Sequence, residues 1–105
     1  MSREVETVRD PVRALAACRE RIDAVDLRIL ELLNERTSIV EEIGRIKREA
    51  RMAIYEPKRE DAVFRNVLEH NSGPLPAEAV KRVFERIIDE MRKVQKQRIE
   101  SGDGI

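Results

Sequence analysis

Apolar residues recur at steps of three and four along the first half of the chain, and no proline falls between Val12 and Tyr55. That spacing is typical of one face of an α-helix. We therefore predict a single helix over residues 12–50, which would be about 55 Å long. The positions that define this apolar series are Leu15, Cys18, Ile22, Val25, Ile29, Leu32, Arg36, Ile39, Ile43, Ile46 and Ala50.

Turn-forming residues predict two shorter helices in the second half of the chain. Pro57 suits the first position of a helix that would end near His70, and it favours an extended backbone at Glu56. The loop NSGPLP follows, and Pro76 opens a third helix that should run to about residue 98. The apolar stripes of these two helices are Val63, Phe64, Val67 and Leu68, then Val80, Val83, Phe84, Ile87, Ile88, Met91 and Val94.

These elements predict an all-α protein with one domain, residues 12–98, between flexible tails at 1–11 and 99–105. Two short helices cannot cover the whole apolar series of a helix as long as the first. A chain of 105 residues also buries only a modest core by itself. We therefore expect a homodimer, in which a second copy covers the remainder of the series.

Composition and charge exclude several classes of function. Charged residues make up 40% of the chain, but 21 basic and 21 acidic residues cancel, which argues against a nucleic-acid partner. No apolar stretch is long enough to cross a bilayer and the start lacks a leader-like segment, so we expect a cytoplasmic protein without a membrane partner. Cys18 is the single cysteine and is expected to be a small buried hydrophobe. With His70 as the single histidine, expected to be solvated at a helix end, no metal site is predicted.

Four polar residues interrupt or adjoin the apolar faces: Arg36, Lys47, Glu60 and Gln95. Lys47 lies within about 20° of Arg36 around the helix and about 16 Å along it, which leaves room for a small anion between the two side chains. Taken singly, each residue is explained by a buried ion pair or by a long side chain that buries only its stem. Taken together, they favour a polar pocket inside a helical bundle. Gly44, within the long helix, suggests close approach of another backbone or of a ligand.

Arg19 extends this set, but it lies about 25 Å from Arg36 along the same helix. One protomer could not bring both guanidinium groups onto one small ligand. An antiparallel partner helix could supply its own Arg19 instead.

Several spaced motifs then indicate a family. R-x-x-I-D-x-x-D (19–26), L-L-x-E-R ending at Arg36, E-I-G-x-x-K ending at Lys47, P-x-R-E (57–60) and Gln95 together resemble the all-helical chorismate mutases. The resemblance spans residues 15–98. It implies an intertwined homodimer of three-helix protomers and the rearrangement of chorismate to prephenate, toward phenylalanine and tyrosine, with no cofactor. It leaves room for another shikimate-pathway enzyme as a partner.

The resemblance also assigns roles to residues. Arg36 and the partner's Arg19 would hold the two carboxylates of chorismate, because a guanidinium binds a carboxylate with two parallel hydrogen bonds. Lys47 and Gln95 would donate to the ether oxygen. Glu60 would accept from the substrate hydroxyl, and Glu56 would assist it through its side chain or backbone. Arg59, the last of the substrate-binding residues, would order this electrostatic cluster.

One residue departs from the family pattern, and two alternatives stay open. Met91 stands where some relatives have a serine, so one hydroxyl contact to a carboxylate is lost. An isochorismate–pyruvate lyase would share the fold and the cationic pocket, although those enzymes tend to lack the equivalent of Glu60. A non-catalytic helical dimerisation or regulatory module is the second alternative.

Overall fold

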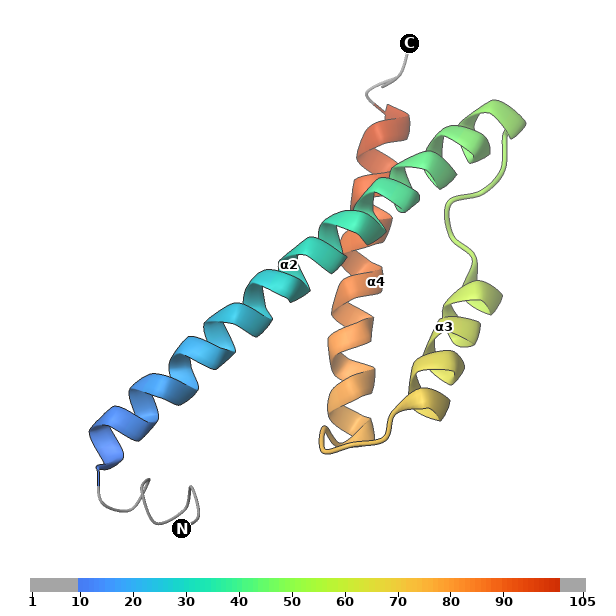
Figure 1. Ribbon diagram of the computed structural model, residues 1–105. Coiled ribbons are helices and arrows are strands. Elements are labelled where there is room, and N and C mark those ends of the chain that lie inside the picture. Colours follow the sequence, from blue (N-terminus) through green and yellow to red (C-terminus); the bar gives the residue numbers. More distant parts are fainter. Residues whose placement is uncertain (1–9, 101–105) are drawn as a thin grey trace. The chain divides into compact units, whose positions relative to one another are not determined.

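The computed structural model of the protein describes residues 10–100, apart from the side chains of 98–100, and these residues form three α-helices without a strand. They are α2 (Pro11–Ala50), α3 (Pro57–His70) and α4 (Ala77–Glu100) (Figure 1). The all-α class and the three-helix protomer with a long first helix are thereby confirmed. The chain divides into two compact units, residues 1–36 and 37–105, and α2 contributes to both.

The helix ends agree with the predicted ones to within two residues. α2 begins one residue early because Pro11 is its first residue and Asp10 caps it, accepting from the backbone N–H of Arg13 at 3.1 Å. α4 begins one residue after Pro76 and continues to Glu100. Most of the two predicted tails, residues 1–9 and 101–105, lies outside the described residues.

α2 ends in a Schellman motif. The N–H of Met52 donates to the carbonyl of Lys47 at 2.8 Å, and the N–H of Arg51 donates to the carbonyl of Arg48 at 3.2 Å. Arg51 has φ 55°, the left-handed conformation that glycine usually supplies at this position. The motif turns the chain sharply, so that the connection 51–56 starts directly beside Lys47.

The core of residues 37–100 lies between α4 and its two neighbours. α3 packs against α4, and the second half of α2 crosses α4 (Figure 1). The buried hydrophobic side chains are Val40 from α2 and Val80, Ile88 and Met91 from the predicted stripe of α4. This small core is thus distributed along α4, from its first turn at Val80 to Met91.

The second half of α2 turns an unexpected face toward α4. Its buried residues are Val40, Gly44 and Lys47, each one position beyond a member of the apolar series. One position is about 100° of rotation, so the series itself faces away from α4. Ile39, Ile43 and Ile46 are accordingly 39–55% exposed.

The first half of α2 carries the rest of the apolar series on an exposed face. Leu15, Ile22 and Leu32 are each more than half exposed. Cys18 was predicted to be buried and is instead exposed, because the described residues of its own unit, 10–36, contain a single helical segment with no second helix to pack on it. Much of the apolar series is therefore exposed.

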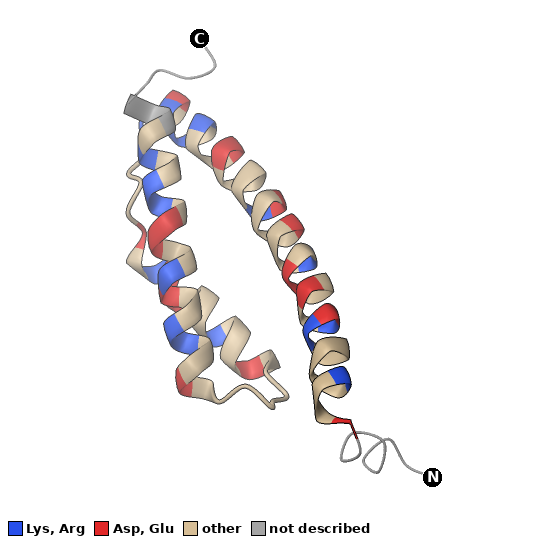
Figure 2. Cartoon of the chain, turned by 90° about the vertical axis from the view of Figure 1, so that its left-hand side faces the viewer, with Lys and Arg blue, Asp and Glu red and all other residues tan. Residues whose placement is uncertain are grey.

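Charge is spread along the helices. Lys and Arg alternate with Asp and Glu on both α2 and α4, as Figure 2 shows. Among residues 10–100, no helix is long and apolar enough to cross a membrane.

Candidate active site

The ammonium group of Lys47 is the centre of a polar cluster at the end of α2. Nζ donates to the carbonyl oxygen of Ile54 at 3.0 Å and to Oε1 of Gln95 at 3.2 Å, and it pairs with Oε1 of Glu56 at 2.6 Å. An ammonium has three N–H donors, so each has one partner here. Lys47 and Gln95 are only 6% and 7% exposed. Their hydrogen bond therefore lies away from bulk water, where charge-directed bonds are strongest.

This arrangement fixes the orientation of the Gln95 amide. Lysine can only donate, so Gln95 must turn its carbonyl oxygen toward Lys47. The amide nitrogen Nε2 then faces away from the ammonium as a donor. Lys47 and Gln95 together present a cation and a neutral N–H donor to the same small region.

Gly44 allows α2 to lie close to Gln95. A Cβ atom at position 44 would lie 3.2 Å from Cγ of Gln95, which is tighter than ordinary van der Waals contact. Gly44 is one turn before Lys47 on the same face of α2. The sequence suggested close approach of another backbone or of a ligand, and the backbone of α4 does lie near, with the carbonyl oxygen and Cα of Gln95 at 3.8 and 3.9 Å from that Cβ position, although the tightest contact is with the Gln95 side chain.

Glu56 is the residue directly before α3, and its side chain pairs with Lys47. Its backbone is extended at φ −130° and ψ 84°, and its side chain makes no capping hydrogen bond to α3. The hydrogen bond and charge of Lys47, with a smaller effect from Arg59, hold the pKa of this carboxyl below its ordinary value. The Glu56 side chain is half exposed, so it is the outer partner of the buried ammonium.

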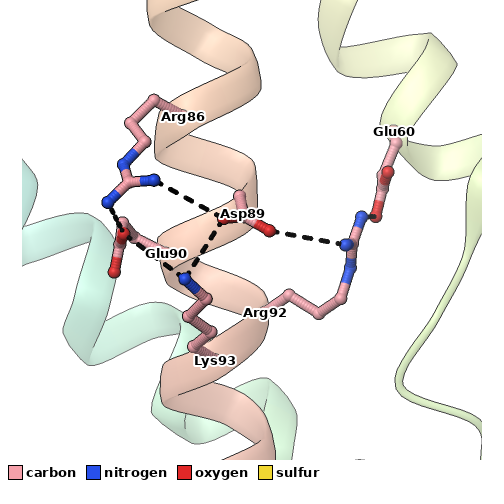
Figure 3. Close-up of polar contacts among 6 residues, drawn as sticks. All are labelled: Glu60, Arg86, Asp89, Glu90, Arg92 and Lys93. Carbon is pink, nitrogen blue, oxygen red and sulfur yellow. Dashed lines mark hydrogen bonds and ion pairs between the residues drawn. The ribbon is translucent and has the colours of Figure 1, made fainter.

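Glu60 belongs to a second cluster, one turn into α3. Its Oε2 accepts from Nη2 of Arg92 on α4 at 2.5 Å (Figure 3). The Arg92 guanidinium also lies 5.2 Å from the centre of the Tyr55 ring, and its Nη1 is 3.8 Å from Oδ1 of Asp89. Glu60 is thus fixed by a cation from the neighbouring helix, and Glu60 raises the pKa of Arg92 in return.

Sequence reasoning missed Arg92. It follows Ile88 by four residues and precedes Gln95 by three, and both of those residues are buried on α4. A cation at that spacing belongs to the edge of the apolar face, as Arg36 does on the first helix. The signal was present in the sequence, but charged residues at 85–93 also fit a solvated surface.

The remaining predicted site residues are placed as follows. Arg19 is exposed and Arg36 is half-buried, and both belong to the unit of residues 1–36. Arg59 is exposed on α3, close enough to Glu56 to affect its pKa. The structure therefore brings Lys47, Glu56 and Gln95 into direct contact, and sets Glu60 on the adjoining helix against Arg92.

Met91 is buried, and its sulfur accepts a hydrogen bond from Thr37 Oγ1 at 3.5 Å. A thioether is only a weak acceptor, so this position supplies no donor to a ligand. His70 is exposed as predicted, with Nδ1 2.8 Å from the carbonyl of Asn66. No group of His, Cys, Asp and Glu in the described part of the chain is arranged to hold a metal ion.

The cluster is suited to an anionic ligand whose charge increases on an oxygen during reaction. Burial fixes the positions of the Lys47 ammonium and the Gln95 amide, and two donors fixed in this way can stabilise developing negative charge once Lys47 exchanges one of its partners for a ligand. Lys47 is engaged by three acceptors, and the amide of Gln95 is not a nucleophile. The geometry thus favours electrostatic stabilisation over covalent chemistry.

Comparison with known proteins identifies the family. The family model of chorismate mutase type II matches residues 18–96. The chain belongs to this family. The match includes every predicted site residue from Arg19 to Gln95, and Arg92 as well.

Individual relatives agree with the assignment to the chorismate mutases. The chain is 42% identical over 78 residues to a bifunctional chorismate mutase/prephenate dehydratase from Neisseria gonorrhoeae, covering 74% of this chain and 21% of that protein. It is 29% identical over 93 residues to a chorismate mutase from Methanocaldococcus jannaschii, covering 85% of this chain and 91% of the relative. The chain therefore spans about a fifth of the bifunctional relative and nearly all of the archaeal one.

A solved structure has the same fold. Form II of the chorismate mutase from Thermus thermophilus superposes with a TM-score of 0.78 at 34% identity, over 79% of this chain and 94% of that one. The three-helix arrangement is therefore that of a chorismate mutase.

Proposed function

We propose that this protein catalyses the rearrangement of chorismate to prephenate, in the synthesis of phenylalanine and tyrosine. In this reaction one C–O bond breaks and one C–C bond forms within the same molecule, so no proton or electron needs to be exchanged with the protein. The buried hydrogen bond between Lys47 Nζ and Gln95 Oε1 is the observation that carries the proposal. It holds two donors where the ether oxygen would gain negative charge.

All three donors of Lys47 have partners within the protein, so one of them must be released to the ether oxygen. Glu56 is the partner best placed to yield, because its side chain is half exposed while Gln95 is buried. The amide nitrogen of Gln95 supplies the second donor. Two such donors contribute through charge development, and each is worth about 3 kcal/mol of transition-state stabilisation in comparable sites.

Glu60 would accept from the hydroxyl group of chorismate, and Arg36 would bind one of its two carboxylates. The second carboxylate would be bound by Arg19 from another copy of the chain. Holding the enolpyruvyl arm against the ring in this way supplies the orientation that the reaction needs. Arg59 would support binding at the entrance to α3.

We further propose that the active protein is an intertwined homodimer. The exposed apolar series of α2, with Leu15, Ile22 and Leu32 more than half exposed, supports this assembly. A single helix face with so much apolar surface normally indicates an interface. A second copy would bury that face and bring Arg19 to the site that one chain leaves incomplete.

Other expectations from the sequence stay predictions. These are a cytoplasmic location and a second shikimate-pathway enzyme as partner. The bifunctional relatives, in which a chorismate mutase is combined with a prephenate dehydratase, support the second.

The direct test is to incubate the purified protein with chorismate, and separately with isochorismate, and to identify the products. Formation of prephenate from chorismate would support the proposal. Salicylate and pyruvate from isochorismate would support the lyase alternative instead. Absence of any product at high protein concentration would contradict both activities and favour a non-catalytic module.

A further inference from the structure

Arg92 joins three elements around the carboxylate of Glu60. Its Nη2 bonds Oε2 of Glu60 on α3, and its guanidinium lies over the ring of Tyr55 in the connection between α2 and α3. On its own helix it lies beside Asp89, one turn back. The cation is therefore held from three sides, and it fixes the position of Glu60 in turn.

The way that Arg92 contacts Glu60 leaves part of the carboxylate available. The contact is made by one nitrogen to one oxygen, Nη2 to Oε2, and not by the two-pronged pairing that an unconstrained arginine and carboxylate favour. Oε1 of Glu60 is left to accept from another donor. Arg92 is also three residues before Gln95 on α4, so it connects the carboxylate to the element that carries the amide donor.

A purely structural ion pair does not explain this geometry. Nε of Arg92 is buried and has no hydrogen-bond partner among the described residues, which is a cost that a freely arranged pair would avoid. The side chains of Arg92 and Glu60 are also 37% and 24% exposed, and ion pairs with that much contact with water contribute little to stability. Both observations are explained if Arg92 serves to hold the Glu60 carboxylate in one direction and not to stabilise the fold.

We propose that Arg92 is a positioning residue, whose guanidinium holds Oε2 of Glu60 so that Oε1 faces the substrate hydroxyl. The proposal rests on the proposed function, since it assigns to Arg92 the task of orienting a group used in that reaction. In this proposal Tyr55 and Asp89 hold the guanidinium in place, and Arg92 holds the Glu60 carboxylate. Glu60 then accepts a hydrogen bond from the substrate hydroxyl.

The test measures kcat and KM for chorismate with Arg92→Met, Arg92→Lys, Glu60→Gln and the double variant Glu60→Gln/Arg92→Met. Arg92→Met is expected to lower kcat by about tenfold, since a misplaced contact group costs on that order or more. KM should change by less than about threefold, because the carboxylate-binding guanidinium groups are unaltered. Arg92→Lys should restore most of kcat, since an ammonium can still reach Oε2.

The double variant separates positioning from direct contact with substrate. If Arg92 acts through Glu60, then Arg92→Met should change kcat by less than about twofold once Glu60 is already glutamine. If Arg92→Met still lowers kcat about tenfold when residue 60 is already glutamine, Arg92 contacts the substrate itself and the positioning role is overturned. An unchanged kcat in the single variant Arg92→Met would also overturn it.

Arg86→Met is the matched control. Arg86 is another arginine of α4 that shares Asp89 with Arg92 and pairs with Glu90 at 2.6 Å, but it does not contact Glu60 (Figure 3). Its kcat should equal that of the original protein. If Arg92→Met fails to fold, as judged by circular dichroism, Arg92→Gln provides the neutral variant with a polar terminus, and the same factor of about ten is expected.

The experiment also separates the two proposals. If the original protein and Arg86→Met are both inactive on chorismate, the proposed function fails and the role of Arg92 fails with it. If both are active and Arg92→Met is equally active, only the role of Arg92 is overturned.

Discussion

The two halves of α2 share one apolar series but differ in burial. In residues 37–50, one face is buried against α4 and carries Val40, Gly44 and Lys47. In residues 11–36, no side chain is fully buried, and apolar residues such as Ile22 and Leu32 lie more than half exposed. The second half thus has buried residues within its own unit, whereas no described residue of the first half is buried.

This difference separates the residues proposed to stabilise the transition state from those proposed to bind the substrate carboxylates. The groups that would act on the breaking bond, Lys47 and Gln95, are fixed by the chain's own core. The arginines that would hold the substrate, Arg19 and Arg36, belong to the half of the helix that exposes its apolar face. Under the proposed function, one chain would therefore prepare the charge-stabilising groups, and full substrate binding would depend on a second copy.

The largest expected effect tests whether the first half of α2 contributes to function. Arg36→Ala should lower kcat/KM for chorismate by roughly a thousandfold, because it removes a charged carboxylate contact in a site partly shielded from water. The helical content measured by circular dichroism should be unchanged. A variant that unfolds would show instead that Arg36 is a member of a structural ion pair.

A second prediction addresses the exposed face of that half. Ile29→Glu places a charge on the apolar series, and an unpaired charge in an apolar interface costs about 3 kcal/mol or more, which is over a hundredfold in association. Sedimentation should show monomers at concentrations where the original protein is a dimer, with activity lost in parallel. Arg28→Glu, one position away and outside the series, is the control and should remain dimeric.

A third prediction concerns the second half and its amide donor. With glutamine at position 95, activity should change little between mildly acidic and mildly alkaline pH, because an amide donates at any pH. Gln95→Glu should be active only while that carboxyl is protonated, so its kcat should fall by about tenfold for each pH unit above the pKa of the new group. A steep loss of activity in the original protein above neutral pH would contradict the assignment.

The fourth prediction sharpens the contact between α2 and α4. Gly44→Ala adds a Cβ atom 3.2 Å from Cγ of Gln95, so the amide must shift by a few tenths of an ångström. We expect kcat to fall roughly fivefold, since donors must be aligned closely to act. The melting temperature should hold or rise, because alanine favours a helix interior by up to ~1 kcal/mol over glycine. A stability loss with unchanged kcat would mean that α2 moved and Gln95 did not.

Much of the fold could be predicted from the sequence, because periodicity and prolines are local signals. The three helices and their ends follow from the spacing of apolar residues and from Pro11, Pro57 and Pro76. The face by which α2 packs could not be predicted in the same way. The apolar series Ile39, Ile43, Ile46 is the stronger stripe, yet α4 packs on the neighbouring positions.

The candidate site was predicted in part for a related reason. Lys47, Glu60 and Gln95 stood out because each interrupts or adjoins an apolar face, and the resemblance supplied their roles. Arg92 did not stand out, since α4 has many charged residues and its partner Glu60 lies 32 positions away in the sequence. Pairings between helices depend on packing that a single sequence does not show directly.

The smallest expected effect concerns the end of the packed half, where Arg51 adopts φ 55°. A residue with a Cβ atom in the left-handed region costs about 1 kcal/mol relative to glycine. Arg51→Gly should therefore raise the free energy of unfolding by about that amount in a denaturant titration, with kcat unchanged. Arg51→Ala is the control, because alanine has the same strain and should give no such gain. Since the Schellman motif lies beside Lys47, a change in kcat for the glycine variant would show that the strained turn also positions the ammonium.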